Sequence, residues 1–75
     1  MSMEEMVELL CRACDRPLTP DTELLESRYL DSLAMVLLEE EWEARGESIS
    51  VARIPHDAMH TARTLWEWYR ENHSP

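Results

Sequence analysis

Lysine is missing altogether from this chain of 75 residues, and its seven basic side chains are all arginines set against 16 acidic residues. The formal net charge of -9 argues against nucleic acid as a partner, because affinity for nucleic acid comes from neutralising phosphates. Basic partners are expected instead, since an acidic surface speeds their encounter and weakens as salt screens it. The simpler interpretation of the charge is that it keeps a small protein soluble.

Glycine and cysteine are scarce as well. With Gly46 as the single glycine, a glycine-rich phosphate loop is impossible, and the GxSxG sequence of many hydrolases is absent. Cys11 and Cys14 form a CxxC pair, but no second pair completes a zinc site and no βαβ pattern suggests a thioredoxin fold. We therefore expect buried, reduced thiols.

Long apolar runs are also absent, and none approaches the roughly 18 residues that a membrane span needs. The N-terminus MSMEEMVELL is acidic where a secretory signal would be basic. We expect a cytoplasmic protein without a membrane span. Its length allows one small domain with little room for an enclosed active site.

A first helix is predicted from about residue 3 by apolar residues at helical spacing. Ser2 followed by Glu5 is a capping-box pattern that marks its start. Pro17 and Pro20 prevent its continuation, so a long loop begins near Asp15. That loop is rich in leucine and is expected to pack over the helices.

A second helix begins at Asp31 or Ser32 and runs to Gly46, which is placed as its C-terminal cap. Its apolar residues form a strip with a wider flank, so the helix is either central to a bundle or offers apolar surface to a partner. The strip consists of Leu33, Val36, Leu37 and Ala44, and the flank of Met35, Leu38 and Trp42.

The sequence after Gly46 predicts a loop, a short helical turn and a last helix. The short turn lies around PHDAM, with Pro55 as its first helical residue, and the last helix follows Thr61 as its cap. We expect an all-α fold, a small four-helix bundle with three main helices and one short one. The apolar residues expected to plug the bundle from the loop are Ile49, Val51 and Ile54.

No catalytic constellation emerges from the sequence. His56 and His60 stand four residues apart, but the glutamate that metalloproteases place after the first histidine and a third ligand are both missing. A triad of Ser32, Asp31 and a distant histidine would lack a pocket to exclude water. We expect no metal site, and a protein that is not an enzyme.

Ser32 is the candidate site that remains. A serine in the first turn of a helix presents its hydroxyl where unpaired amides and the helix dipole favour a phosphate group. Taken alone, however, Asp31 and Ser32 fit a plain helix cap better, because both residue types are common there.

The longer segment TELLESRYLDSLAMVLLEEEWEARGESISV resembles the acyl and peptidyl carrier protein family, and the resemblance extends over essentially the whole chain. In that family an Asp-Ser-Leu triplet, here Asp31, Ser32 and Leu33, opens the second helix, and the serine carries 4′-phosphopantetheine. Val36 and Leu38 fall where the family has core residues. The loop LLESRYLDS is most similar to D-alanyl carrier proteins, whereas ARGESIS is more like peptidyl carrier domains.

One position departs from the family. Three residues before the Asp, where carriers usually have glycine, this chain has Arg28. The loop must therefore avoid a positive φ at Arg28 or bear a cost of roughly 1 kcal/mol or more. Arg28 also places a cation beside the expected attachment point.

The resemblance implies a single carrier-protein domain over residues 1–75 that holds an acyl or aminoacyl group as a thioester and shuttles it between biosynthetic enzymes. The implied partners are a phosphopantetheinyl transferase, an adenylating ligase or acyltransferase, and a downstream acyl-accepting enzyme, each met by a monomer. The residues expected to contact partners are Arg28, Met35, Glu39, Glu40 and Glu43.

A function of another class stays open at this point. A small acidic helical adaptor could bind a protein partner through exposed tryptophans, because aromatic residues are common anchors at interfaces. The candidates are Trp42, Trp66 and Trp68. Such an adaptor needs no modified serine.

Overall fold

The computed structural model describes residues 1–73, which form three α-helices and no strand. The helices are α1 (Met3–Cys14), α2 (Ser32–Ala44) and α3 (Ala62–His73). Two 3₁₀ turns, η1 (Val51–Arg53) and η2 (His56–Met59), lie between α2 and α3. The expected all-α fold is confirmed. A four-helix bundle is not, because the short fourth helix is present only as the turn η2.

The helix α1 begins and ends where its sequence predicts. The Ser2 hydroxyl accepts a hydrogen bond from the Glu5 backbone N–H at 3.1 Å, and the Ser2 backbone N–H donates to the Glu5 carboxylate at 3.0 Å. At the other end Asp15 adopts a left-handed conformation, with φ 54°, which aspartate tolerates better than most residues. The chain therefore leaves the helix before reaching Pro17.

The carboxylate of Glu5 makes this capping box sensitive to acid. The hydrogen bond from the Ser2 backbone is the main cause that holds the pKa of Glu5 below its ordinary value, and the guanidinium of Arg45 adds to it. A carboxylate with a lowered pKa in the folded state stabilises the protein above its unfolded pKa, and that stabilisation is lost as the pH falls through the folded pKa.

We therefore expect Glu5→Gln to lower the Tm near neutral pH and to flatten its decline between about pH 6 and about pH 3. Thermal unfolding followed by circular dichroism at each pH measures this slope. Glu71→Gln is the matched control, because Glu71 is also an exposed helical glutamate. Equal slopes for wild type and Glu5→Gln would contradict the expectation.

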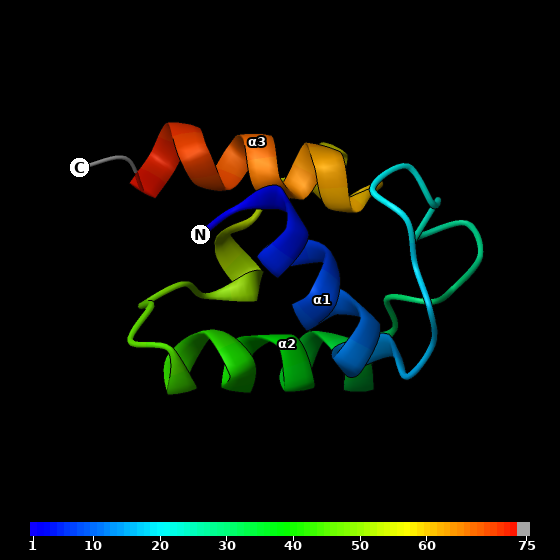
Figure 1. The fold of residues 1–75 in the computed structure, drawn as a ribbon, viewed down its shortest axis with the longest axis horizontal. Helices are drawn as coiled ribbons and strands as arrows, with labels where there is room; N and C mark the ends of the chain where they lie inside the picture. The colour runs from blue at the N-terminus through cyan, green and yellow to red at the C-terminus, as the bar shows by residue number, and fades with distance from the viewer. Residues whose placement is uncertain (74–75) are drawn as a thin grey trace.

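The helix α1 is the central one. In Figure 1 it crosses between α2 and α3, and it is packed against both of them. The long loop between α1 and α2 closes one end of the molecule, at which the first turn of α2 also lies. The backbone N–H of Leu24 ties this loop to the rest by donating to the carbonyl of His60 at 2.7 Å. Leu24 and Leu30 are buried, so the predicted packing of the loop over the helices is confirmed.

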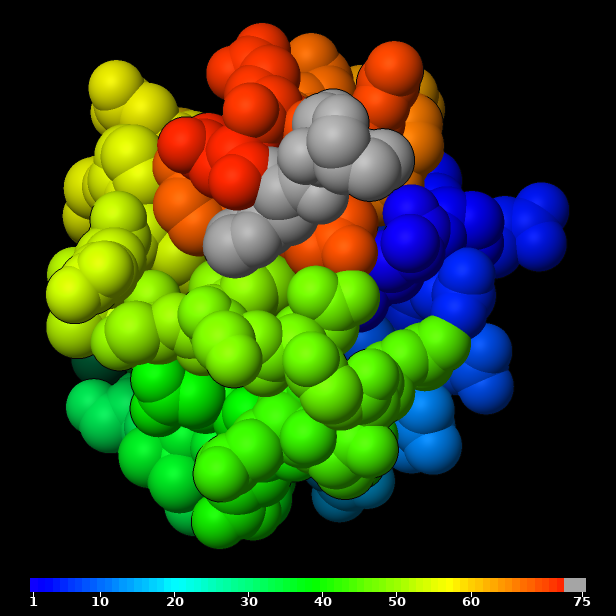
Figure 2. Space-filling view, turned by 90° about the vertical axis from the view of Figure 1, so that its left-hand side faces the viewer, coloured from blue at the N-terminus to red at the C-terminus, as the bar shows by residue number. Residues whose placement is uncertain are grey.

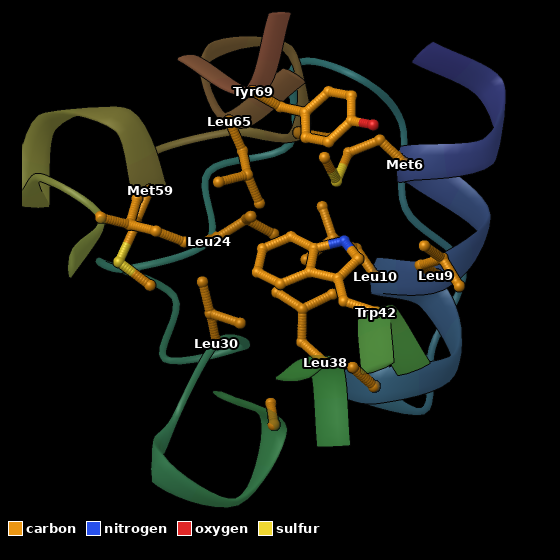
Figure 3. Close-up of a cluster of buried hydrophobic side chains, with 14 of the residues drawn as sticks. Met6, Leu9, Leu10, Leu24, Leu30, Leu38, Trp42, Met59, Leu65 and Tyr69 are labelled. Carbon is orange, nitrogen blue, oxygen red and sulfur yellow. The ribbon is translucent and has the colours of Figure 1, made fainter. Parts of the chain in front are cut away.

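One hydrophobic core joins these elements, with the ring of Trp42 at its centre (Figure 3). Leu10, Leu38 and Leu65 reach this ring from the three helices and, like it, are wholly buried. The segment after α2 lies as a band between α2 and α3 (Figure 2). It contributes Ile49 and Ile54 to the core, as predicted. The other buried side chains are Met6, Leu9, Ala13, Leu24, Leu30, Ala34, Met59, Ala62 and Tyr69.

The helix α2 buries its predicted flank and exposes its predicted strip. Its core side consists of Ala34, Leu38 and Trp42, which recur at every fourth residue. Leu33, Val36 and Leu37 are 67%, 53% and 37% exposed, so the expectation that Val36 is a core residue is wrong. The physical reason is that α2 packs on α1 and η1 along one side only. Of the two roles considered for this helix, the structure shows the one that offers apolar surface.

The two cysteines are free, but they are half-buried rather than buried as expected. The Cys11 sulfur accepts a hydrogen bond from the Leu18 backbone N–H at 3.3 Å, which ties the loop to α1. Burial is the main cause that raises the pKa of the Cys14 thiol, and the carboxylate of Asp31 adds to it. Within residues 1–73, no helix combines the length and the apolar character that crossing a membrane requires.

Candidate functional site

Ser32 is the first residue of α2 and is exposed. Asp31, in extended conformation, caps the helix, because its carboxylate accepts a hydrogen bond from the Ala34 backbone N–H at 2.9 Å. The Ser32 hydroxyl has no hydrogen-bond partner among the residues that the structure describes. Of the two residues that could have capped the helix, Asp31 does so, and the serine oxygen is left available for chemistry.

Arg28 takes the costlier of the two conformations considered for it. Its φ is 63°, in the left-handed region that favours glycine. The turn is closed by a hydrogen bond of 3.0 Å from the Arg28 backbone N–H to the carbonyl of Leu25. A Cβ in this region costs roughly 1 kcal/mol or more. The chain therefore bears a backbone strain four residues before Ser32.

Replacing Arg28 with glycine is expected to stabilise the protein by about 1 kcal/mol, because it relieves this strain. Chemical unfolding in urea measures the difference. Arg53→Gly is the matched control, since Arg53 is another exposed arginine but its φ is not positive. The control is expected to lose stability, and a loss of stability in both variants would refute the strain at Arg28.

A groove of about 380 Å³ lies beside Ser32, between the end of α1, the end of the long loop and the start of α2. Asp31 and Leu33, the two neighbours of Ser32 in the chain, both line it. Arg28 lines the same groove from the loop. The structure thus brings together the predicted triplet and the predicted cation at one end of the molecule.

A second groove, of about 440 Å³, lies between α2 and the segment after it and is lined by acidic residues. Glu39, Glu40, Glu43 and Glu47 line it. Two of these carboxylates have structural hydrogen bonds: Glu39 accepts from the Val51 backbone N–H at 3.1 Å, and Glu47 from the Tyr69 hydroxyl at 2.7 Å. Glu40 and Glu43 have no such bond in the described chain, and both are exposed.

The five residues expected to contact partners therefore divide into three groups. Glu39, Glu40 and Glu43 lie together in the acidic groove, whereas Arg28 lines the separate groove beside Ser32. Met35 is half-buried and packs against the core.

The tryptophans are not the exposed set that an adaptor would need. Trp42 is wholly buried, so its expected role as an exposed contact is wrong: it lies one turn beyond Leu38 on the core side of α2. Trp66 is half-buried and its indole N–H donates to the carbonyl of Met1 at 3.1 Å. Trp68 is half-buried as well.

His56, the first residue of η2, lies close to His60, the residue that follows η2. Their ring centroids are 5.8 Å apart. His60 also faces the carboxylate of Glu23 at 3.6 Å and that of Asp57 at 3.9 Å. Among the side chains of residues 1–72, no group of three or more His, Cys, Asp and Glu is arranged to hold a metal ion.

Two parts of this region were not predicted from the sequence. The sequence left open whether the strip that contains Leu33, Val36 and Leu37 is buried or exposed, and it placed Val36 in the core, whereas all three are exposed. Arg12, from the last turn of α1, and Arg16, just after the helix, also line the groove beside Ser32, and no sequence signal places them there. Comparisons of the chain with protein families, with curated proteins and with solved structures found no match.

Proposed function

We propose that this chain is a carrier protein whose Ser32 receives a 4′-phosphopantetheine arm. The observation that carries the proposal is the exposed Ser32 hydroxyl, which stands in the first turn of α2 without a described partner while Asp31 caps the helix. The same proposal includes the fold, a small four-helix bundle of the acyl carrier protein type. In a carrier-type bundle, η2 takes the place of the short helix between the second and third main helices.

The residues around Ser32 fit such an arm. The hydroxyl is exposed, so a modifying enzyme can reach it, and no hydrogen bond to a described residue has to break first. The unpaired amides and the positive end of the α2 dipole favour a phosphate group at this place. When bound, the arm supplies a terminal thiol that holds an acyl or aminoacyl group as a thioester.

Attachment is a transfer from coenzyme A by a phosphopantetheinyl transferase. A bond forms between the Ser32 oxygen and the phosphorus that bears the pantetheine. The anhydride bond between the two phosphates of coenzyme A breaks, and adenosine 3′,5′-bisphosphate leaves. The hydroxyl proton passes to a base of the transferase. The carrier contributes an accessible oxygen and no catalytic group of its own.

Partners dock on α2 and the rim of the acidic groove. Leu33, Val36 and Leu37 offer an apolar patch next to Ser32, and Glu40 and Glu43 offer unpaired negative charge further along the same helix. Exposed charges of this kind speed association with basic enzymes and are screened by salt. The partners are the transferase, an adenylating ligase or acyltransferase, and a downstream acyl-accepting enzyme, all met transiently in the cytoplasm.

The test is incubation of the purified chain with a transferase of broad specificity and coenzyme A, followed by intact-mass measurement. The mass is expected to rise by one phosphopantetheine group. A carrier of known activity in the same reaction shows that the transferase works. A chain whose mass does not change beside a modified control would refute the proposal.

A further inference from the structure

Three of the chain's seven arginines line the groove beside Ser32. Arg12, Arg16 and Arg28 line it together with two carboxylates, those of Asp15 and Asp31. The carboxylate of Glu41 lies 3.8 Å from Arg12 and offsets that cation, so the groove is close to neutral in a protein whose net charge is -9. An anion is therefore repelled less in this groove than by the molecule as a whole, and Arg28 is the cation that can bind it.

Arg28 is the cation of this groove that remains unpaired. The guanidinium of Arg12 lies 3.8 Å from the carboxylate of Glu41, and that of Arg16 lies 3.9 Å from the ring centroid of Tyr29. The exposed side chain of Arg28 makes no ion pair, hydrogen bond or ring contact with any side chain among residues 1–72. Its planar set of donors matches two oxygens of a phosphate group.

The same groove has an aliphatic wall. Leu33 and Leu37, which are 67% and 37% exposed, line it from the first turns of α2. Exposed leucines next to an unpaired guanidinium suit a ligand that is anionic at one end and aliphatic directly beyond it. A phosphodiester followed by a branched alkyl group is such a ligand, because its anionic group comes first and its aliphatic group directly after.

We infer that the groove seats the first part of the arm on Ser32, an inference that rests on the proposed function. Arg28 holds the phosphodiester, and the dimethyl carbon next to it packs on Leu33 and Leu37. The occupant is the chain's own arm because Asp31 and Leu33, on either side of Ser32, both line the groove. A group bonded to the Ser32 oxygen therefore begins at its edge. Glycine would adopt the positive φ at position 28 without strain, and a binding role for the guanidinium would explain why an arginine is present there instead.

Thermal unfolding of the apo and holo forms measures this contact. The arm is expected to raise the Tm of the wild type by roughly 4 °C, and Arg28→Gln to remove most of that rise. The matched control is Arg53→Gln, because Arg53 is also exposed and unpaired within the described residues but lines a different groove. This control is expected to keep the rise.

Phosphorus NMR of the holo-proteins gives a second measurement. The phosphodiester resonance is expected to differ between wild type and Arg28→Gln and to coincide between wild type and Arg53→Gln. One common resonance and equal rises in Tm for all three would overturn the inference. The proposed function would stand in that case, because the arm would be attached but not seated, whereas an unmodified wild type refutes the proposed function itself.

If the transferase does not modify Arg28→Gln, the wild-type holo-protein alone can still be tested. Raising the ionic strength to about 1 M shortens the Debye length to about 3 Å and weakens an exposed guanidinium–phosphate contact. The phosphodiester resonance is then expected to move toward its position in the same protein unfolded in urea. Such a shift would support binding of the phosphodiester in the groove. A resonance that stays in place as salt is added would overturn it.

Discussion

Replacing Ser32 with alanine is expected to abolish attachment of the arm completely while leaving the protein folded. The loss is total because the substitution removes the oxygen that forms the phosphodiester. The fold is kept because the hydroxyl has no described hydrogen-bond partner and Asp31, not Ser32, caps α2. Alanine is also the best helix former, so the free energy of unfolding should change by no more than about 0.5 kcal/mol.

Intact mass after incubation with transferase and coenzyme A measures the attachment, and urea unfolding measures the stability. Ser48→Ala is the matched control, because Ser48 is an exposed serine in the segment after α2. The control is expected to gain one arm, as the wild type does. A Ser32→Ala protein that still gains the mass would move the attachment to another hydroxyl and refute the assignment to Ser32.

The ends of the helices were predictable because their signals are local. Ser2 and Glu5 lie within one turn of each other, and their capping box forms as the sequence pattern indicates. Gly46 follows Arg45, the C-cap residue of α2, and adopts a φ of 83°, a conformation that a glycine at this place predicts. Asp31 and Ser32 define the start of that helix in the same way.

The buried face of α2 was not predictable from periodicity. Residues 33–38 are all apolar, so helical spacing alone fits more than one face. The choice is made by tertiary packing, since α1 and η1 meet the helix along Ala34, Leu38 and Trp42. The same packing leaves Leu33, Val36 and Leu37 exposed to solvent. These apolar residues are therefore a candidate docking surface and not part of the core.

The groove beside Ser32 depends on contacts between distant parts of the chain. Arg12 comes from the last turn of α1, Arg16 from the start of the long loop and Arg28 from its end. That loop is fixed by hydrogen bonds, among them the 3.1 Å bond from the Leu30 backbone N–H to the carbonyl of Leu24. The sequence could state the two conformations open to Arg28, but only these contacts determine that its φ is positive.

Replacing Trp42 with alanine is expected to destabilise the protein by about 3–5 kcal/mol, because it empties the centre of the core. At roughly 0.05–0.15 kcal/mol per residue, the whole stability of so short a chain is of similar size, so much of the variant should be unfolded. Trp42→Phe should cost less, because it keeps a buried ring and removes an indole N–H that has no described hydrogen-bond partner. Leu33→Ala, at a residue 67% exposed, is the control and should change the stability by about 0.5 kcal/mol or less.

Urea unfolding of the three variants also tests whether Trp42 can anchor a protein partner. A side chain that anchors a partner can be truncated without unfolding the free protein, whereas a core side chain cannot. The structure therefore predicts the order of stability Leu33→Ala, then Trp42→Phe, then Trp42→Ala, with the last far below the others. A Trp42→Ala protein as stable as the wild type would place Trp42 outside the core, and would restore it as a candidate contact for a protein partner.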